Sequence, residues 1–251
     1  MHTRHNLSKI KEIVFSKEMM LFEKRQFLRN NSYSFMKNAG KKVFQFINKN
    51  FDNNQPIIVL CGPGNNGGDG FVIAKYLKNH GYPINVYILS KEHNYKGDAL
   101  TAVKEFGKDF KKIGSFQLKK NALIVDALFG IGLTRNIKGI LIKIFNKINN
   151  SNNRVVSVDI PSGVCSNTGE ILGSAIKADF TITFHRKKVG HVLGSGKKFS
   201  GKLIVVDIGF TQGKMKTRCL ENSPSLWIKY FSWKKPSGHK YSRGRGGNER
   251  T

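Results

Sequence analysis

The sequence has 251 residues, 39% of them hydrophobic and 11% aromatic, and a formal net charge of +27. This length and apolar content suffice for one packed domain and exclude a disordered chain, and no apolar run approaches the ~18 residues of a membrane-spanning helix. Three widely separated cysteines, Cys61, Cys165 and Cys219, argue against a disulfide framework or a zinc site. We therefore expect a reduced, cytoplasmic protein.

The basic residues are spread along the whole chain. A charge this large attracts nucleic acid at low salt, but no basic stripe interleaved with aromatic residues, of the kind that stacks bases, stands out. We attribute the charge to surface positions that a compositional bias fills with lysine. We therefore expect neither nucleic acid nor a membrane as a partner.

Apolar residues at helical spacing predict two helices near the amino-terminal end, within residues 16–25 and 34–47. Beyond them, apolar runs predict strands at 57–61, 84–89, 123–125, 155–158, 180–184 and 203–206. Between these strands, helical patterns cover 71–79, 96–106 and 137–147. This alternation is typical of a doubly wound, mostly parallel sheet in an α/β protein. We interpret residues 194–201 as a loop.

Residues 61–70 read CGPGNNGGDG and follow the first expected strand. Glycine costs backbone entropy wherever it is ordered, so this density of glycines indicates a specific backbone requirement. We expect a sharp turn that offers backbone N–H groups to an anion at the start of a helix. Gly62, Gly64 and Gly67 match the dinucleotide fingerprint, a weak signal because no acidic residue ends the next strand. A P-loop is excluded, since no Gly-Lys-Ser/Thr follows.

Three aspartates, Asp126, Asp159 and Asp207, directly follow expected strands. Carboxyl ends of parallel strands share one rim of the sheet, and ligands bind beyond that rim. For Asp207 we favour a role in capping the next turn. Asp126 and Asp159 begin richer loops, the first with Arg135 near its end and the second with Ser162 in a tight turn. Together with the asparagines of the glycine loop, they suit an anionic ligand and an oxygen-ligated cation.

Five segments, taken together, resemble the NAD(P)H-hydrate epimerase family. They are CGPGNNGGDG at 61–70, DALFGIG at 126–132, SVDIPSG at 157–163, ADFTITF at 178–184 and VDIG at 206–209. The resemblance runs in order over about residues 16–210. It implies a Rossmann-like three-layer α/β/α sandwich with a mostly parallel sheet, formed by residues 1–210, in a protein that is usually a homodimer.

The resemblance also implies an isomerase of metabolite repair that interconverts the R and S forms of NADH or NADPH hydrated at nicotinamide C6, called NADHX and NADPHX. Carried over motif by motif, Asn66, Asp126 and Ser162 would hold a potassium ion. The residues that would contact the dinucleotide hydrate are Asn65, Asn66, Gly67, Gly68, Asp69, Gly130, Ile131, Gly132, Leu133, Thr134, Arg135, Asn136 and Asp159.

Epimerisation at C6 requires the hydroxyl to leave and water to return on the other face. A positioned carboxyl group can protonate the leaving hydroxyl and then take a proton from the incoming water, a contribution of roughly 10²–10⁴-fold. We assign Asp159 to this catalytic role as a hypothesis.

In many bacteria the family's domain is fused to a dehydratase that uses ADP or ATP, and residues 239–245 resemble the opening of that second domain. We therefore expect residues 211–251 to be a basic linker, the stub of a missing dehydratase domain. The chain itself should have no dehydratase activity and should work with a separate ADP- or ATP-dependent NAD(P)H-hydrate dehydratase.

Two other functions stay open. One is a non-catalytic domain of the same fold that dimerises and binds RNA or protein partners, as in messenger-RNA decapping scaffolds. The other is a different nucleotide-binding enzyme on a flavodoxin-like or Rossmann fold, which would bind a flavin or plain NAD. The intact set Asn66, Asp126, Asp159 and Ser162 favours catalysis, because a scaffold has no need of it.

Overall fold

The structure is a computed structural model that describes residues 12–211, 215, 217 and 219–230. A compact body is formed by Glu12–Cys219, and the described segment 220–230 belongs to a second unit. Residues 239–245, which resemble the dehydratase opening, lie outside the described residues. The expected boundary after residue 210 stays a prediction.

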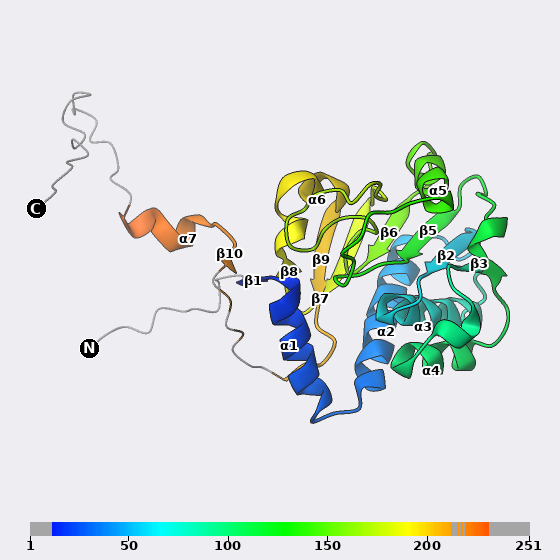
Figure 1. Cartoon of the computed structure of the whole chain (residues 1–251), viewed down its shortest axis with the longest axis horizontal. Coiled ribbons are helices and arrows are strands. Elements are labelled where there is room, and N and C mark those ends of the chain that lie inside the picture. The colour runs from blue at the N-terminus through cyan, green and yellow to red at the C-terminus, as the bar shows by residue number, and fades with distance from the viewer. Residues whose placement is uncertain (1–11, 212–214, 216, 218, 231–251) are drawn as a thin grey trace, which may run out of the picture. The chain divides into compact units, whose positions relative to one another are not determined.

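Seven strands of the compact body form one sheet in which every described pairing is parallel (Figure 1). Their spatial order is β4 (Lys111–Lys112), β3 (Ile84–Ile88), β2 (Ile57–Cys61), β5 (Leu123–Ala127), β6 (Val155–Val158), β7 (Phe180–Phe184) and β9 (Lys202–Val206). The chain extends from β2 to one edge and then from β5 to the other. The order therefore reverses between β2 and β5, the place where open α/β sheets bind ligands.

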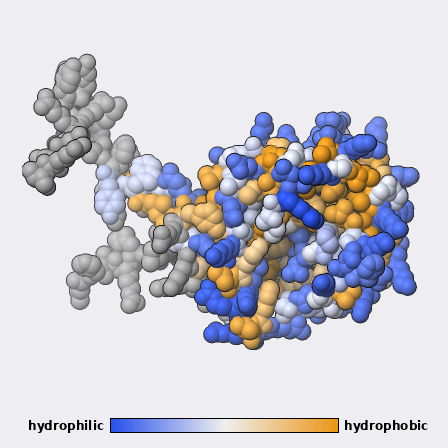
Figure 2. All heavy atoms as spheres, in the orientation of Figure 1, coloured by the Kyte–Doolittle hydropathy of each residue, from blue (hydrophilic) through white to orange (hydrophobic). Residues whose placement is uncertain are grey.

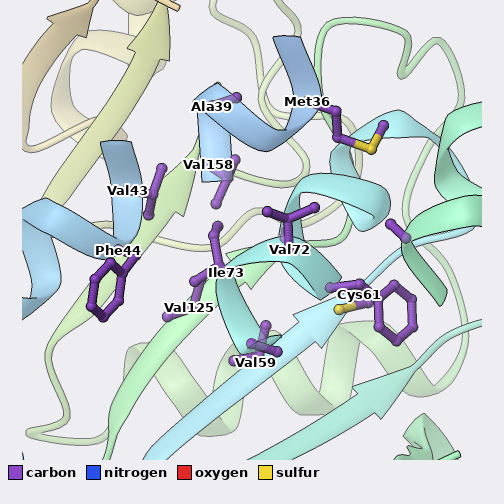
Figure 3. Packing of buried hydrophobic residues seen from close by; sticks show 14 of the residues in the cluster. Met36, Ala39, Val43, Phe44, Val59, Cys61, Val72, Ile73, Val125 and Val158 are labelled. Carbon is purple, nitrogen blue, oxygen red and sulfur yellow. The ribbon is translucent and has the colours of Figure 1, made fainter. Parts of the chain in front are cut away.

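Helices cover both faces of this sheet, as expected for a three-layer sandwich. Val59 of β2 packs in one cluster with residues of α2 (Ser32–Asn50) and α3 (Asn65–Asn79), as Figure 3 shows. The next residue, Leu60, points to the other face and joins the cluster of α5 (Ile140–Asn149). Because side chains alternate along a strand, a strand buried on both faces is apolar throughout. The predicted fold class is confirmed.

The remaining elements are shorter or lie outside the sheet. β1 pairs in parallel with β8 in a second, small sheet. The elements not yet placed are β1 (Glu12–Val14), α1 (Ser16–Phe27), α4 (Gly97–Phe106), β8 (Lys187–Lys188), α6 (Gly194–Phe199), β10 (Cys219–Leu220), α7 (Pro224–Trp227) and the 3₁₀ turns η2 (Glu92–Asn94), η3 (Ile113–Ser115), η4 (Val189–His191) and η5 (Ile228–Tyr230).

The structure corrects the expectation for the glycine loop. Helix α3 begins at Asn65, six residues before the predicted start at Phe71, so three of the glycines lie inside the helix. A Cβ on Gly67 would lie 1.8 Å from the carbonyl oxygen of Gly62, and one on Gly70 would lie 2.8 Å from the Cys61 sulfur. These glycines are therefore required for close packing of α3 against the turn and β2.

The loop expected at 194–201 is also wrong in part, because Gly194–Phe199 forms helix α6. Its backbone is held by a tertiary contact: the N–H of Gly196 donates to the carbonyl of Gly169 at 2.8 Å. A Cβ on Gly196 would lie 1.9 Å from the carbonyl oxygen of Gly190. Close packing thus outweighs the low helix propensity of glycine here.

Hydrophilic residues are spread over the face of the compact body seen in Figure 2, with hydrophobic ones between them. None of the helices in the described part of the chain is both long and apolar enough to cross a lipid bilayer.

Candidate active site

A cavity of about 720 Å³ opens beyond the carboxyl ends of β2, β5 and β6, with α1 and α2 also contributing to its walls. Its volume lies in the range of sites for small molecules and cofactors. It brings together most of the predicted dinucleotide contacts, namely Asn65, Asn66, Asp69, Gly130, Ile131, Gly132, Leu133, Thr134, Arg135 and Asp159.

Three predicted contacts do not line this cavity. Gly67 and Gly68 lie in the packed first turns of α3, where a Cβ on Gly68 would come within 2.7 Å of the Met36 methyl group. Asn136 lies instead beside Gly173. Their contact with the dinucleotide hydrate stays a prediction.

Asp126 joins β5, β6 and the loop after β6. It lies within β5, one position before the end, rather than after the strand, and the sheet register places it beside Ser157 of β6. The fully buried carboxylate accepts hydrogen bonds from the Ser157 hydroxyl (2.9 Å), the Ser162 hydroxyl (2.6 Å), the Ser162 N–H (2.8 Å) and the Leu128 N–H (3.3 Å). Burial raises the pKa of Asp126, and these bonds oppose the rise.

Asn66 is the one predicted cation ligand whose polar atoms need a partner. Both its amide nitrogen and its amide oxygen are buried without a hydrogen bond, which costs about 1–3 kcal/mol when nothing binds there. Its side chain lies against Gly130, where a Cβ would be 3.4 Å from Asn66 Cγ. Ser162 Oγ accepts from the Phe129 N–H at 2.9 Å. The amide of Asn66, the hydroxyl of Ser162 and the carboxylate of Asp126 carry the types of oxygen ligand that suit a hard cation such as potassium.

Asp159 lies at the end of β6 with a positive φ of 66°. Its Oδ1 accepts from the Lys188 ammonium (2.6 Å) and the Thr183 hydroxyl (3.0 Å). Lys188 is only 1% exposed and also donates to Thr183 Oγ1 (2.8 Å) and to the Phe184 carbonyl (3.2 Å), which accounts for its three N–H bonds. Burial alone would raise the pKa of Asp159, but the charge and hydrogen bond of Lys188 hold it below the ordinary value.

The second oxygen of Asp159 faces the loop after β5, which lines the cavity and contains Gly130. Oδ2 lies 3.4 Å from the place where a Cβ on Gly130 would stand, and both residues line the cavity. Asp159 is therefore an ionised carboxylate with one oxygen fixed and the other directed to the loop that lines the site.

His191 fixes the backbone of Asp159. Its Nδ1 accepts from the Lys188 backbone N–H at 3.0 Å, so the proton is on Nε2, which donates to the Asp159 carbonyl at 2.8 Å. Burial lowers the pKa of His191 to about 4, so the ring is neutral at neutral pH. This contact supports a left-handed backbone conformation, which costs a residue other than glycine about 1–3 kcal/mol.

Two further carboxyl groups share the cavity with Asp159. Burial raises the pKa of Glu23, in α1, to about 7, and it raises that of Asp69, in α3, well above the ordinary value. The negative charge of Asp159 adds to both shifts, and Lys188 opposes the shift of Glu23. The site therefore holds carboxyl groups whose pKa values move in opposite directions, an arrangement typical of acid–base pairs.

Sequence reasoning missed Glu23, Lys188, Thr183 and His191. Thr183 lies within the ADFTITF segment, and Lys188 and His191 follow that strand within a few residues, so a basic residue beyond a strand end was an available signal. The sequence offers no such signal for Glu23, because an acidic residue is ordinary on an amphipathic helix. The expectation for Asp207 is confirmed: it is exposed and accepts from the Gly209 N–H at 2.8 Å, capping the turn.

An all-parallel sheet with a cavity at its switch point defines a Rossmann-like α/β domain. The chain belongs to the family described as YjeF-related protein N-terminus, whose match covers residues 32–190. A crystal structure of yeast ynu0, YNL200c, has a TM-score of 0.60 at 25% identity, over 71% of this chain and 82% of that one. The resemblance found in the sequence is confirmed.

Two relatives give the family context. The chain is 36% identical over 186 residues to a protein of Lentilactobacillus buchneri named NAD(P)H-hydrate epimerase, covering 72% of this chain and 86% of that protein. It is 34% identical over 231 residues to the bifunctional NAD(P)H-hydrate repair enzyme Nnr of Moorella thermoacetica, covering 85% of this chain. The chain spans only 44% of that longer relative.

Proposed function

We propose that this chain is an NAD(P)H-hydrate epimerase, which interconverts the R and S forms of NADHX and NADPHX. The observation that carries the proposal is the convergence of three loops, after β2, β5 and β6, on one cavity with the ionised Asp159 at its wall. The epimerase of L. buchneri, which matches this chain over most of its own length, supports the same activity.

The chemistry of the site suits this reaction. Loss of hydroxide from C6 leaves a positive charge on the ring, and a buried carboxylate such as Asp159 stabilises such a charge. Its free Oδ2 can also take a proton from the water that attacks C6. The first N–H groups of α3, beside Asn65 and Asn66, suit the negative phosphates of a dinucleotide, because a helix N-terminus attracts anions.

We place a potassium ion against Asn66, Asp126 and Ser162. A bound cation would add fixed positive charge between the glycine loop and the loop after β6. The buried, unpartnered amide of Asn66 supports this assignment. The hydrogen bonds of Asp126 with Ser162 join β5 to the loop after β6.

We further propose that the chain acts as a homodimer in the cytoplasm and supplies the form of the hydrate that an ADP- or ATP-dependent dehydratase consumes. The bifunctional relatives, of which this chain spans less than half, support a functional link to such a second activity.

The test mixes the chain with pure R-hydrate and follows the S form by chiral chromatography. Asp159→Asn should lower the rate by roughly 10²–10⁴-fold. Asp207→Asn is the matched control, because Asp207 also ends a strand but is exposed and outside the cavity, and it should keep the wild-type rate. A wild-type chain with no activity that binds RNA would support the scaffold alternative, and one that binds a flavin would support the other enzyme.

A further inference from the structure

Helix α1 presents Glu23 to the cavity from a rigid position. At its first residue, the backbone N–H and the hydroxyl of Ser16 donate to Asn167 Oδ1 at 2.8 and 3.0 Å. Near its end, Gln26 Oε1 accepts from the N–H (3.1 Å) and the hydroxyl (2.8 Å) of Thr211. Met19, Phe22 and Gln26 on the buried face fix its rotation. A helix held at both ends in this way gives Glu23 a defined place.

Glu23 belongs to the charged group around the reacting site. It lines the same cavity as Asp159 and Asp69. The groups on other elements that act on it are Lys188, which favours its charged form, and Asp159, which favours its neutral form, while Glu23 in turn acts on Asp69. Because Lys188 is already bonded to Asp159, Glu23 has no cation of its own among these groups.

We propose that Glu23 is the catalytic proton donor to the hydroxyl that leaves C6, while Asp159 serves as the base for the incoming water. This inference rests on the proposed epimerase function. The C6–O bond breaks as the Glu23 carboxyl proton moves to that oxygen, so water departs and the nitrogen lone pair of the ring forms the C6=N1 bond. Water then adds to the other face of C6 and gives its proton to Asp159 Oδ2. The proton returns from Asp159 to Glu23 through solvent.

The environments of the three carboxyl groups support this division. Asp159 is ionised and has one oxygen occupied by Lys188 and Thr183, which suits the base of the R-to-S direction. In the reverse direction the two carboxyl groups exchange roles. The pKa of Glu23 lies at about 7, near the value at which a group both donates and regains a proton most effectively. Asp69 is 9% exposed, and burial, together with the charges of Asp159 and Glu23, raises its pKa well above the ordinary value.

The experiment compares the wild type, Glu23→Gln and Glu105→Gln in the R-to-S assay across the pH range. Glu105 is the matched control, an exposed glutamate paired with Lys75 outside the cavity. We expect Glu23→Gln to lower kcat by at least about 100-fold and to lose the limb near neutral pH on which the wild-type rate falls with rising pH. Glu105→Gln should keep both the rate and the limb.

A second measurement does not depend on turnover. A carboxyl NMR titration of the wild-type chain, with Glu23→Gln used for assignment, should show the Glu23 signal changing with a midpoint near 7. A midpoint at the ordinary glutamate value overturns the inference. So does a folded Glu23→Gln that keeps the wild-type rate and pH limb while the wild type is active. A wild type that leaves the R form unchanged overturns the epimerase function itself.

Discussion

Replacing Lys188 by methionine tests the buried ion pair of the site. The side chain is 1% exposed, and its ammonium donates to Asp159, Thr183 and the Phe184 carbonyl. Methionine keeps the length but removes the charge and all three donors. Breaking a buried ion pair by removing one partner costs about 3–5 kcal/mol, because the other charge stays buried and uncompensated. We expect Lys188→Met to lower the free energy of unfolding by that amount at neutral pH.

The stability of the wild type and that of Lys188→Met should depend on pH in opposite directions. In the wild type, the lowered pKa of Asp159 adds stability above its unfolded value of about 3.9, and that stability is lost as the pH falls through the folded value. Without Lys188, burial raises the pKa of Asp159 above its unfolded value. The variant should therefore gain stability as the pH falls from about 7 toward about 4. The difference in unfolding free energy between the wild type and Lys188→Met should narrow over the same range.

The assay is urea unfolding at both pH values, since urea does not screen charges. Lys177→Met, at an exposed lysine, is the control and should change stability by less than about 0.5 kcal/mol. Adding Asp159→Asn to Lys188→Met removes both charges and should restore part of the lost stability. A loss below about 1 kcal/mol at neutral pH, or a loss that does not shrink in acid, would refute the reasoning.

Further predictions concern the loops. Gly62→Ala would place a Cβ 1.7 Å from the Leu128 carbonyl oxygen and should lower the stability in thermal unfolding by about 3 kcal/mol or more. Gly114→Ala, at an exposed glycine with nothing within 4 Å of the new Cβ, should change stability by less than about 0.5 kcal/mol. Equal effects of the two substitutions would contradict the packing role of Gly62. Asp126→Asn replaces an acceptor oxygen by a donor among four donors, so it should cost about 1–3 kcal/mol and abolish any dependence of activity on potassium. A variant that still responds to potassium would exclude Asp126 as a ligand.

Six strands of the main sheet were predictable because each is an apolar run, and β2, for example, is buried on both faces. Their parallel arrangement made the rim predictable too, since Asp126 and Asp159 lie at the carboxyl ends of two strands of one sheet. The short strands β1, β4 and β8 were not, because pairing defines them and no hydrophobic pattern does.

The partners of Asp159 could not be predicted in the same way. Lys188 reaches it across 29 positions of the chain, and whether a lysine is buried depends on the fold rather than on its neighbours in sequence. Glu23 comes from a helix outside the sheet, so no strand-end rule brings it to the site. The sequence placed the start of α3 too late, at Phe71, because close packing of Gly67 and Gly70 outweighs the low helix propensity of glycine.

The most direct test of the central claim is the time course of pure R-hydrate with the wild-type chain in potassium and in sodium buffers. The account predicts that the S form appears until the two forms reach equilibrium, and that it does so faster in potassium. If the S form accumulates in both buffers no faster than in an enzyme-free sample, the result would contradict the epimerase function.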